Sequence, residues 1–209
     1  MPKKQRDEVA IIGFTHRPSV PGASVVFDMM RNEEVWGFNH LFDLWSVGRF
    51  DRWFELHDLG YLKKVEGMWA DHLMKLRGIR MPLYMQKKHK DIPASRVFPR
   101  EAIEKLTPQG WYHMSSVDWM LAFAILEGFK TVHIYGVSFG VDEAGQEPLT
   151  ARACLEYWIG VAQGRGMAVN VYGSHLFKWL AYEEGYAQYG YNTKIRNVTQ
   201  ADYGWQPPE

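Results

Sequence analysis

The sequence predicts an α/β fold in which helices cover both faces of a mostly parallel β-sheet. Short, β-branched apolar runs alternate along the chain with longer segments whose apolar residues recur at helical spacing. Strands that alternate with helices indicate parallel strand–helix–strand units in an open sheet. The length of 209 residues suits one such domain, and 46% hydrophobic with 23% charged residues is enough for a packed core.

The first half of the chain supplies three of the expected strands. Residues 8–14 form a short apolar run ending near glycine, which is typical of a strand buried on both faces. A loop rich in Pro, Ser and Gly leads to a short helix expected at 23–32, and a second strand follows at 34–39. A helix is expected at 41–48. Residues 50–58 alternate apolar with polar side chains, which indicates a third strand.

The middle of the chain continues the alternation. Apolar residues at helical spacing predict a helix over 65–79, and residues 81–86 predict a further strand. Residues 87–106 begin as a Pro-containing basic loop and lead into a helix. Residues 115–129 give the strongest helix prediction, because serine stands at the start as an N-cap and glycine follows the end.

The last third completes the expected sheet. Residues 130–137 predict its central strand, 150–166 a second strong helix, and 167–173 a final strand. The expected architecture is therefore a single Rossmann-like α/β domain over residues 1–180. Residues 181–209 are rich in aromatic side chains and predict a C-terminal extension or arm that packs on another subunit.

The composition argues against several classes of protein. Twenty-four basic and 24 acidic side chains cancel, so net charge gives no general attraction to nucleic acid or membranes. Cys154 is the only cysteine, which excludes an intramolecular disulfide and fits a reducing cytosol. No apolar run reaches membrane-spanning length, and no signal peptide or paired-cysteine zinc spacing is seen. We expect a cytoplasmic protein without membrane contact or bound metal.

Polar residues stand where most of the predicted strands end. In open α/β sheets, ligands bind outside the carboxyl ends of the strands, near the point where strand order reverses. The segments at these ends read "GFTHRPS", "GFNH", "ELHD", "MQKKHK" and "GVSFGVD". Because five strand ends carry matching polar residues, we expect a ligand-binding cleft along this edge.

Several candidate site segments also have a plainer structural interpretation. The turn containing Arg17 suits a phosphate but lacks a complete phosphate-loop motif, and an ordinary Pro-rich turn explains it equally well. Ser115 and Ser116 at a helix start favour an anion, although simple N-capping accounts for serine there. His57 and Asp58 are either an acid–base pair or a solvated loop pair.

Four stretches of the sequence resemble the bacterial CMP-sialic-acid-dependent sialyltransferases that have a single Rossmann-like domain. They are "SSVDWMLAFAILEGFKTVHIYGVSFGVD", the "RPS" after the first strand, "VWGFNHLF" and "ACLEYWIGVAQGRGMAVNVY". The same outline, which spans residues 9–178, is similar to archaeal 6-hydroxymethylpterin pyrophosphokinase-like proteins. Small proteins encoded by tailed phages look nearest of all. The resemblance implies a nucleotide-binding domain.

The resemblance implies roles for individual residues. Asn39 would hydrogen-bond the base or ribose of a nucleotide donor, and Gly136 would let the donor approach the strand end. Together with Arg17, whose charge suits phosphate, the expected donor-binding residues are Thr15, His16, Arg17, Ser19, Asn39, Ser115, Ser116 and Gly136.

The sequence departs from this family where catalysis is concerned. Ser138 replaces the family's aspartate, and the stretch before the last helix lacks its catalytic histidine. A general base would therefore come from elsewhere, and it must reach the acceptor hydroxyl directly or through one water. The candidate bases are Asp142, Glu143 and Glu147 on the following loop, and His57 across the cleft.

These observations favour glycosyl transfer from a nucleotide-sugar substrate, without a tightly bound cofactor or metal. The phage-like resemblance suggests a 5-hydroxymethylated pyrimidine in DNA as acceptor, in the host cytoplasm. Lys87, Lys88 and Arg96 in the basic loop would then contact the DNA backbone. Two alternatives stay open: magnesium-dependent pyrophosphoryl transfer from ATP to a pterin-like alcohol, and a non-catalytic nucleotide-binding or assembly module that forms homo-oligomers through its aromatic arm.

Overall fold

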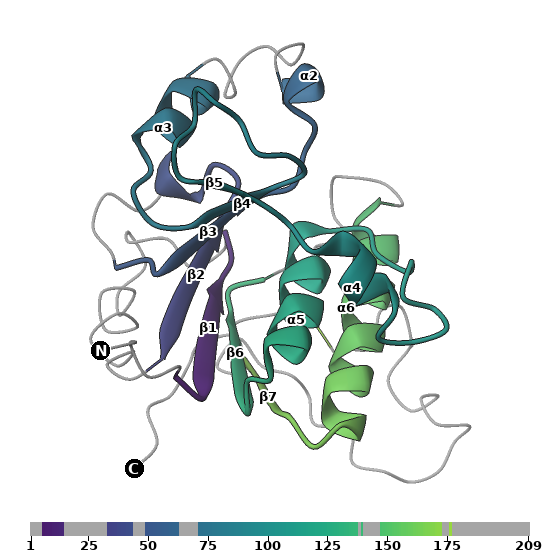
Figure 1. Cartoon of the computed structure of the whole chain (residues 1–209). Helices are drawn as coiled ribbons and strands as arrows, with labels where there is room; N and C mark the ends of the chain where they lie inside the picture. The colour runs from purple at the N-terminus through teal and green to yellow at the C-terminus, as the bar shows by residue number, and fades with distance from the viewer. Residues whose placement is uncertain are drawn as a thin grey trace, which may run out of the picture.

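The computed structural model confirms the α/β prediction (Figure 1). It describes residues 6–14, 33–43, 49–62, 71–137, 139, 147–172 and 176. These residues form one seven-stranded sheet in which every neighbouring pair of strands is parallel. The strands are β1 (Glu8–Ile12), β2 (Glu34–Phe38), β3 (Arg52–Glu55), β4 (Leu83–Met85), β5 (Ser95–Val97), β6 (Thr131–Tyr135) and β7 (Ala168–Tyr172).

The strand order β5-β4-β3-β2-β1-β6-β7 fixes where a ligand would bind. From β1 the chain builds outward through β2 to β5, and it then crosses to the other side of β1 to add β6 and β7. The order therefore reverses between β1 and β6. In sheets of this kind the loops at such a switch point separate, and ligands bind outside the carboxyl ends of the strands there.

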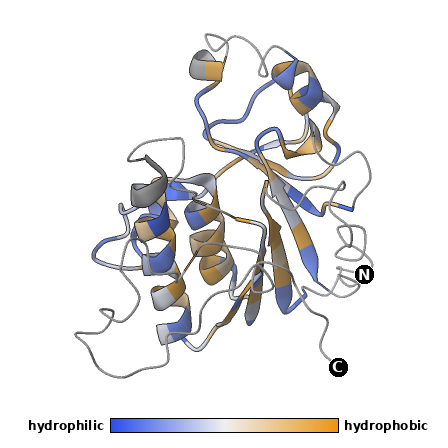
Figure 2. Cartoon of the chain, turned by 180° about the vertical axis from the view of Figure 1, so that it is seen from behind, coloured by the Kyte–Doolittle hydropathy of each residue, from blue (hydrophilic) through white to orange (hydrophobic). Residues whose placement is uncertain are grey.

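The helices of the described chain are η1 (Leu41–Asp43), α2 (Leu59–Leu62), α3 (His72–Gly78), α4 (Arg100–Glu104), α5 (Ser116–Glu127) and α6 (Glu147–Gly164). Helices α2 and α3 form one group, and α4, α5 and α6 form another (Figure 1). Figure 1 shows α5 and α6 side by side along one side of the sheet, with α4 beside them. Figure 2 shows α5 mostly in hydrophobic colours, whereas hydrophilic residues interleave along α6. Helix α5 is accordingly the inner member of the pair.

Alternate residues of β1 supply two separate cores. The strand expected at the centre of the sheet, β6, instead lies next to the edge strand β7. Val9 and Ile11 of β1 pack in the cluster that contains Trp36, Phe123 of α5 and Trp158 of α6. A second cluster lies on the opposite face of the sheet, with members Ala10, Ile12, Val35, Leu41, Trp53, Leu62, Leu76, Leu83, Met85, Ile92 and Tyr135. Burial of both faces explains why the β1 sequence is continuously apolar.

Helix α5 begins and ends as its sequence predicts. Ser115 is the N-cap, and its side chain and that of Asp118 form a reciprocal capping box. Gly128 follows the last turn with a φ of 79°, a left-handed conformation that costs glycine little. Of the two serines at the helix start, Ser115 therefore has the capping role, which leaves Ser116 in the first turn with a different one.

Three sequence predictions differ from the structure. The segment 87–106, expected as a loop before a helix, also contains the short strand β5, which extends the sheet beside β4. Residues 50–58 were expected to alternate, yet Trp53, Phe54 and Glu55 are all buried. Within the described residues, the helix expected at 41–48 is represented only by the 3-10 turn η1. The helix expected at 23–32 and the arm at 181–209 lie outside the described residues.

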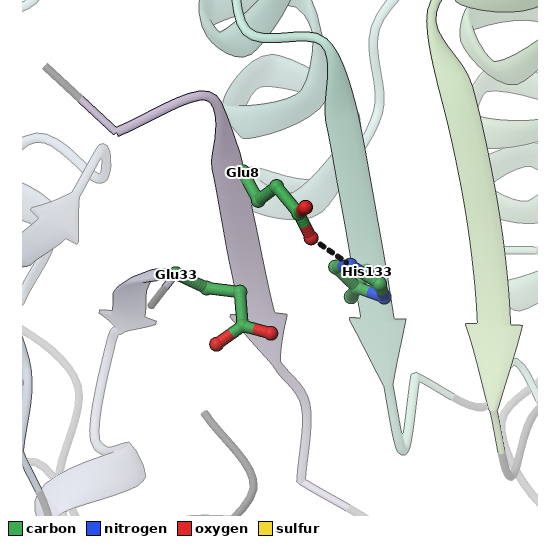
Figure 3. Close-up of side chains that lie close together, drawn as sticks. All are labelled: Glu8, Glu33 and His133. Atoms are coloured by element: carbon green, nitrogen blue, oxygen red, sulfur yellow. Dashed lines mark hydrogen bonds and ion pairs between the residues drawn. The ribbon is translucent and has the colours of Figure 1, made fainter. Parts of the chain in front are cut away.

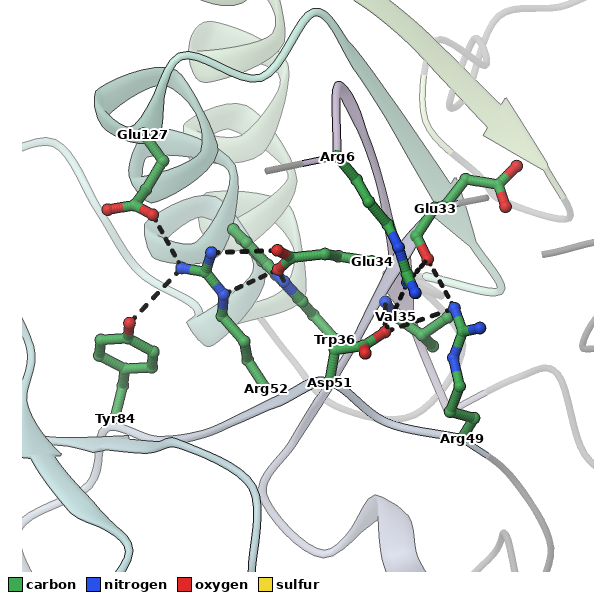
Figure 4. Close-up of polar contacts among 10 residues, drawn as sticks. All are labelled: Arg6, Glu33, Glu34, Val35, Trp36, Arg49, Asp51, Arg52, Tyr84 and Glu127. Atoms are coloured by element: carbon green, nitrogen blue, oxygen red, sulfur yellow. Dashed lines mark hydrogen bonds and ion pairs between the residues drawn. The ribbon is translucent and has the colours of Figure 1, made fainter. Parts of the chain in front are cut away.

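An ion-pair network ties the amino ends of β2 and β3 to α5 (Figure 4). The Arg52 guanidinium binds the Glu34 carboxylate at 2.8 Å and the Glu127 carboxylate at 2.9 Å, and it lies over the Trp36 ring. These contacts are at the end of the sheet opposite the expected ligand edge, so their role is to hold α5 on the sheet.

No helix among the described residues is both long and apolar enough to cross a membrane.

Candidate functional site

Asn39 and Ser116 meet at the carboxyl edge of the sheet, although 77 residues separate them. Asn39 follows the last residue of β2, and Ser116 opens α5. The Ser116 hydroxyl donates a hydrogen bond of 3.3 Å to the Asn39 side-chain oxygen. The structure thus brings together two of the residues expected to bind a donor nucleotide.

The backbone holds the Asn39 side chain in a fixed position. Its φ of 50° is the only positive value at a non-glycine residue within the described chain. Asparagine tolerates this left-handed conformation better than most residues. The Asn39 N–H donates to the Phe54 carbonyl at 2.9 Å, and its carbonyl accepts from the Trp53 indole at 3.2 Å. Because the side-chain oxygen faces Ser116, the amide NH₂ is the part of the Asn39 side chain that could donate a hydrogen bond to a ligand.

The N-terminus of α5 offers hydrogen-bond donors and a positive dipole end beside Asn39. The N–H groups of Ser116 and Val117 find no acceptor among the described residues, as expected for the first turn of a helix. A helix of 12 residues places a partial positive charge at this end, which favours an anion such as a phosphate. Ser116 contributes its hydroxyl to the same region.

A buried carboxylate fixes this helix start from below. Asp118 Oδ2 accepts from the N–H groups of Met114 and Ser115 and from the Ser115 hydroxyl. Asp118 Oδ1 is 2.7 Å from Nδ1 of His113, whose ring stacks between Trp119 and Trp158. Both side chains are buried, with 1% of His113 and none of Asp118 exposed. The pair therefore positions the first turn of α5 and does not itself face a ligand.

Two glycines let the ends of β1 and β6 lie close together at the switch point. The Gly13 N–H donates to the Tyr135 carbonyl at 2.6 Å, and a Cβ at Gly13 would lie 2.4 Å from the Gly136 carbonyl oxygen. Gly136 has a φ of 60°, which side chains other than glycine rarely adopt. Gly136, expected to admit a donor, also has this structural reason to be glycine.

His57 lies at the same edge, after β3, and it is bound to a buried carboxylate that the sequence did not single out. Glu55 Oε1 is 2.6 Å from His57 Nδ1 and also accepts the His57 backbone N–H at 3.1 Å. Glu55 Oε2 is 2.5 Å from Nε2 of His72, the first residue of α3. Glu55 and His72 are buried, whereas 37% of the His57 side chain is exposed. Only His57 of the three presents its ring at the surface.

The histidines determine the ionisation of Glu55. Burial alone would raise the pKa of this carboxyl group, because it penalises the charged form. Hydrogen bonds from His57 and His72, together with their charge, outweigh burial and hold the Glu55 pKa below its usual value. Glu55 is therefore a carboxylate at neutral pH, and it can stabilise a proton on a neighbouring imidazole.

The basic residues expected to contact an acceptor lie on the surface at and beyond β4. Lys87 and Lys88 follow β4 at its carboxyl end, and Arg96 belongs to the edge strand β5. All three side chains are exposed and form no ion pair with another described residue. Their charges are thus available to an anionic partner.

Glu147 is the first residue of α6. The candidates that lie outside the described residues are Thr15, His16, Arg17, Ser19, Asp142 and Glu143.

One group of described side chains could hold a metal ion, and it lies away from this edge. One ligand atom each from Glu8, Glu33 and His133 lies within 4.8 Å of the others. Figure 3 shows Glu33 reaching toward β1 from the residue before β2, while Glu8 binds the His133 ring at 3.0 Å. Glu8 is the first residue of β1, so the group is near the amino end of the sheet. A metal there would not meet a phosphate held at the start of α5.

An exposed aromatic side chain precedes α5. The Trp111 side chain is 68% exposed, unlike Trp36, Trp53 and Trp158, which are buried in the two cores. Among the described tryptophans, Trp119 is half-buried and Trp111 is exposed. Exposed indole rings stack on sugars and bases.

Comparison with protein-family models, with curated proteins and with solved structures gives no match for this chain.

Proposed function

We propose that the chain transfers a glycosyl group from a nucleotide-sugar to an acceptor hydroxyl, with the nucleotide bound along the carboxyl edge of β1, β2 and α5. The observation that carries this proposal is the contact between Ser116 and Asn39. It places an amide able to read a base or ribose next to the positive end of a helix. A nucleoside diphosphate has both features, a hydrogen-bonding base or ribose and a negative charge.

The helix start also suits the chemistry of the leaving group. When the bond between the sugar and the phosphate breaks, negative charge develops on the phosphate oxygens. N–H donors fixed in advance by the Asp118 contacts stabilise that charge without reorganising, which is the largest contribution in many enzymes. This arrangement supports departure of the phosphate without a metal ion at the edge.

The acceptor side is supported by charge. Lys87, Lys88 and Arg96 provide exposed positive side chains near the end of β4, where a polyanion would approach. We propose a 5-hydroxymethylated pyrimidine in DNA as acceptor, whose backbone these residues contact. A target base would have to leave the duplex stack to reach the edge. The net charge of zero is consistent with weak, local contact with DNA and not with broad affinity.

Thermal unfolding in the presence of nucleotides tests this function. The ligands are CMP, UDP, UDP-glucose, GDP, ATP, and ATP with magnesium. A ligand present at 100 times its Kd stabilises the folded chain by about 2.7 kcal/mol. For a chain of this size, each kcal/mol raises Tm by roughly 2–4 °C. We expect a nucleoside diphosphate or its sugar to raise Tm without magnesium.

Variants of Asn39 locate the site. Asn39→Ala should abolish the ligand-induced rise in Tm, and Asn39→Gly should do the same while accommodating the positive φ without strain. Asn170→Ala is the matched control, because Asn170 is an exposed asparagine on β7. It should leave the rise unchanged. A response that requires magnesium and ATP would favour pyrophosphoryl transfer, and no response to any nucleotide would contradict the proposal.

A further inference from the structure

Glu55, His57 and His72 form one hydrogen-bonded unit. It resembles the carboxylate–histidine pairs in which a buried carboxylate activates a histidine as a base. One carboxylate oxygen binds His57 Nδ1 at 2.6 Å, and the other binds His72 Nε2 at 2.5 Å. The carboxylate has no exposure to solvent, and the His57 ring is 37% exposed. A buried carboxylate that holds Nδ1 of a surface histidine fixes the ring and stabilises the imidazolium when the histidine takes a proton.

The backbone and α3 set this geometry. The Glu55 oxygen that binds the His57 ring also accepts the His57 backbone N–H, so the loop after β3 is tied to the carboxylate at two points. His72 holds the second oxygen and prevents the carboxylate from rotating. The His72 ring in turn stacks on Phe42 at 5.2 Å, within the core on this side of the sheet. The unit is therefore rigid up to the exposed ring.

The unit lies beside the proposed donor site. The Asn39 N–H donates to the Phe54 carbonyl, one residue before Glu55, because β2 and β3 are neighbouring strands. Helix α5 packs on one face of the sheet, whereas His72 of α3 reaches Glu55 from the other. A nucleotide at the start of α5 and an acceptor near His57 would thus approach the edge from its two sides.

We propose that His57 is the general base that deprotonates the acceptor hydroxyl and that Glu55, itself held by His72, is its positioning residue. This inference rests on the proposed glycosyl transfer. Because Nδ1 faces Glu55, Nε2 is the nitrogen that accepts the proton. The acceptor oxygen forms a bond to the anomeric carbon as the bond from that carbon to the phosphate oxygen breaks. The nucleotide leaves with the electron pair, and the imidazolium later releases its proton to solvent.

Charged and polar side chains on the elements around this unit also make contacts of their own. The Asp58 carboxylate accepts the Gly60 N–H at 2.8 Å, and the Lys75 ammonium lies over the Phe42 ring. Gln86 of the segment after β4 donates to the Leu56 carbonyl at 2.9 Å and is neutral. Glu55 is accordingly the carboxylate that the described contacts place on the His57 ring.

The first arm of the test is independent of sugar transfer. Nitrogen-15 NMR of the histidine rings, above the pH at which His57 titrates, should show His57 with its proton on Nδ1. Glu55→Gln should lower the pH at which His57 titrates, because the carboxylate that favours the charged ring is gone. An Nε2-protonated ring in the wild-type protein, or an unchanged titration in Glu55→Gln, would overturn the inference.

The second arm measures transfer with the nucleotide-sugar that stabilises the protein. His57→Gln should lower kcat by about 10² to 10⁴-fold, the usual contribution of a general base. Glu55→Gln should lower kcat by a smaller factor and move the acid limb of the pH profile to lower pH. His133→Gln, in the group near the amino end of the sheet, is the control and should leave kcat unchanged.

The two proposals fail in distinguishable ways. If the wild-type protein transfers no sugar at all, the proposed function is wrong. If it transfers sugar and His57→Gln retains full kcat with an unchanged pH profile, the inference about His57 is wrong and the proposed function stands. Thermal melting of each variant verifies that it is folded, and His57, which is partly exposed, is the safer substitution of the two.

Discussion

Among the residues that the structure describes, the carboxylates of Asp118 and Glu55 are completely buried, and each binds a histidine. Asp118 binds His113, and Glu55 binds His57, with similar separations of 2.7 and 2.6 Å. The difference lies in the surroundings of the imidazole: 1% of His113 is exposed and 37% of His57. A contact between a carboxylate and a histidine therefore does not by itself indicate catalysis. The first pair has no access to a substrate and organises a helix start, whereas the second presents its ring at the edge where ligands bind.

The largest expected effect on stability comes from breaking the contact between Asp118 and His113. Asp118→Asn should lower the free energy of unfolding by about 3 kcal/mol or more, because the amide cannot accept all four hydrogen bonds and leaves buried donors unpaired. Urea denaturation measures the loss. Glu101→Gln, at an exposed position in α4, is the control and should change stability by less than about 0.5 kcal/mol. A loss equally small in Asp118→Asn would show that this contact is dispensable.

The second effect depends on pH and concerns Glu55. Its pKa in the folded protein lies below the ordinary value of 4.5, so the ionised carboxylate stabilises the fold above that pH. The stabilisation is lost as the pH falls from 4.5 through the lower folded value. Glu55→Gln should therefore cost about 2 kcal/mol at neutral pH, and this cost should shrink as the pH falls below 4.5. Urea denaturation from pH 7 to pH 3 measures both proteins. A cost that is constant over this range would contradict the assigned ionisation.

The next effect separates two adjacent serines on the same helix. Ser115→Ala removes the N-cap and should cost about 1 kcal/mol of stability. For Ser115→Ala and Ser116→Ala, we would measure both the free energy of unfolding and the rise in Tm caused by a nucleotide. Ser115→Ala should mainly lower the free energy of unfolding.

The smallest expected effect on stability is that of Ser116→Ala. Ser116 does not cap the helix, and its hydroxyl contacts Asn39, so its loss should cost less than about 0.5 kcal/mol. The rise in Tm caused by a nucleoside diphosphate should nevertheless shrink. If Ser116→Ala is as destabilising as Ser115→Ala, the distinction between a capping serine and a ligand-facing serine is wrong.

The sequence predicted those features that local patterns encode. Helix α5 has a capping serine, an apolar middle and a terminal glycine, and its bounds agree with the prediction to within two residues. The buried strands β1, β2 and β6 were recognisable as apolar runs. The strand β5 was not, because three residues are too few to show a period. The strand-end rule, which applies to all parallel sheets, indicated the edge where Asn39 and Ser116 meet.

The sequence could not indicate the partners of the two histidines. Glu55 stands in a run that alternates apolar with polar residues, and this pattern gives no sign that Glu55 is buried. Its burial depends on His72, which is 17 residues further along the chain and arrives with α3. Asp118 likewise stands in the first turn of a helix, where acidic residues are favourable. The stack of His113 between Trp119 and Trp158 exists only in the folded chain. Contacts of this kind leave no periodic signal.

The proposed nucleotide site lies where β1, β2 and α5 meet. Titration of nitrogen-15-labelled protein with UDP, without magnesium, tests this most directly, because each backbone amide reports on its own surroundings. The largest changes should fall on the amides of Asn39, Ser116, Val117 and Gly136. Changes concentrated around Glu8, Glu33 and His133, or no saturable change anywhere, would contradict it.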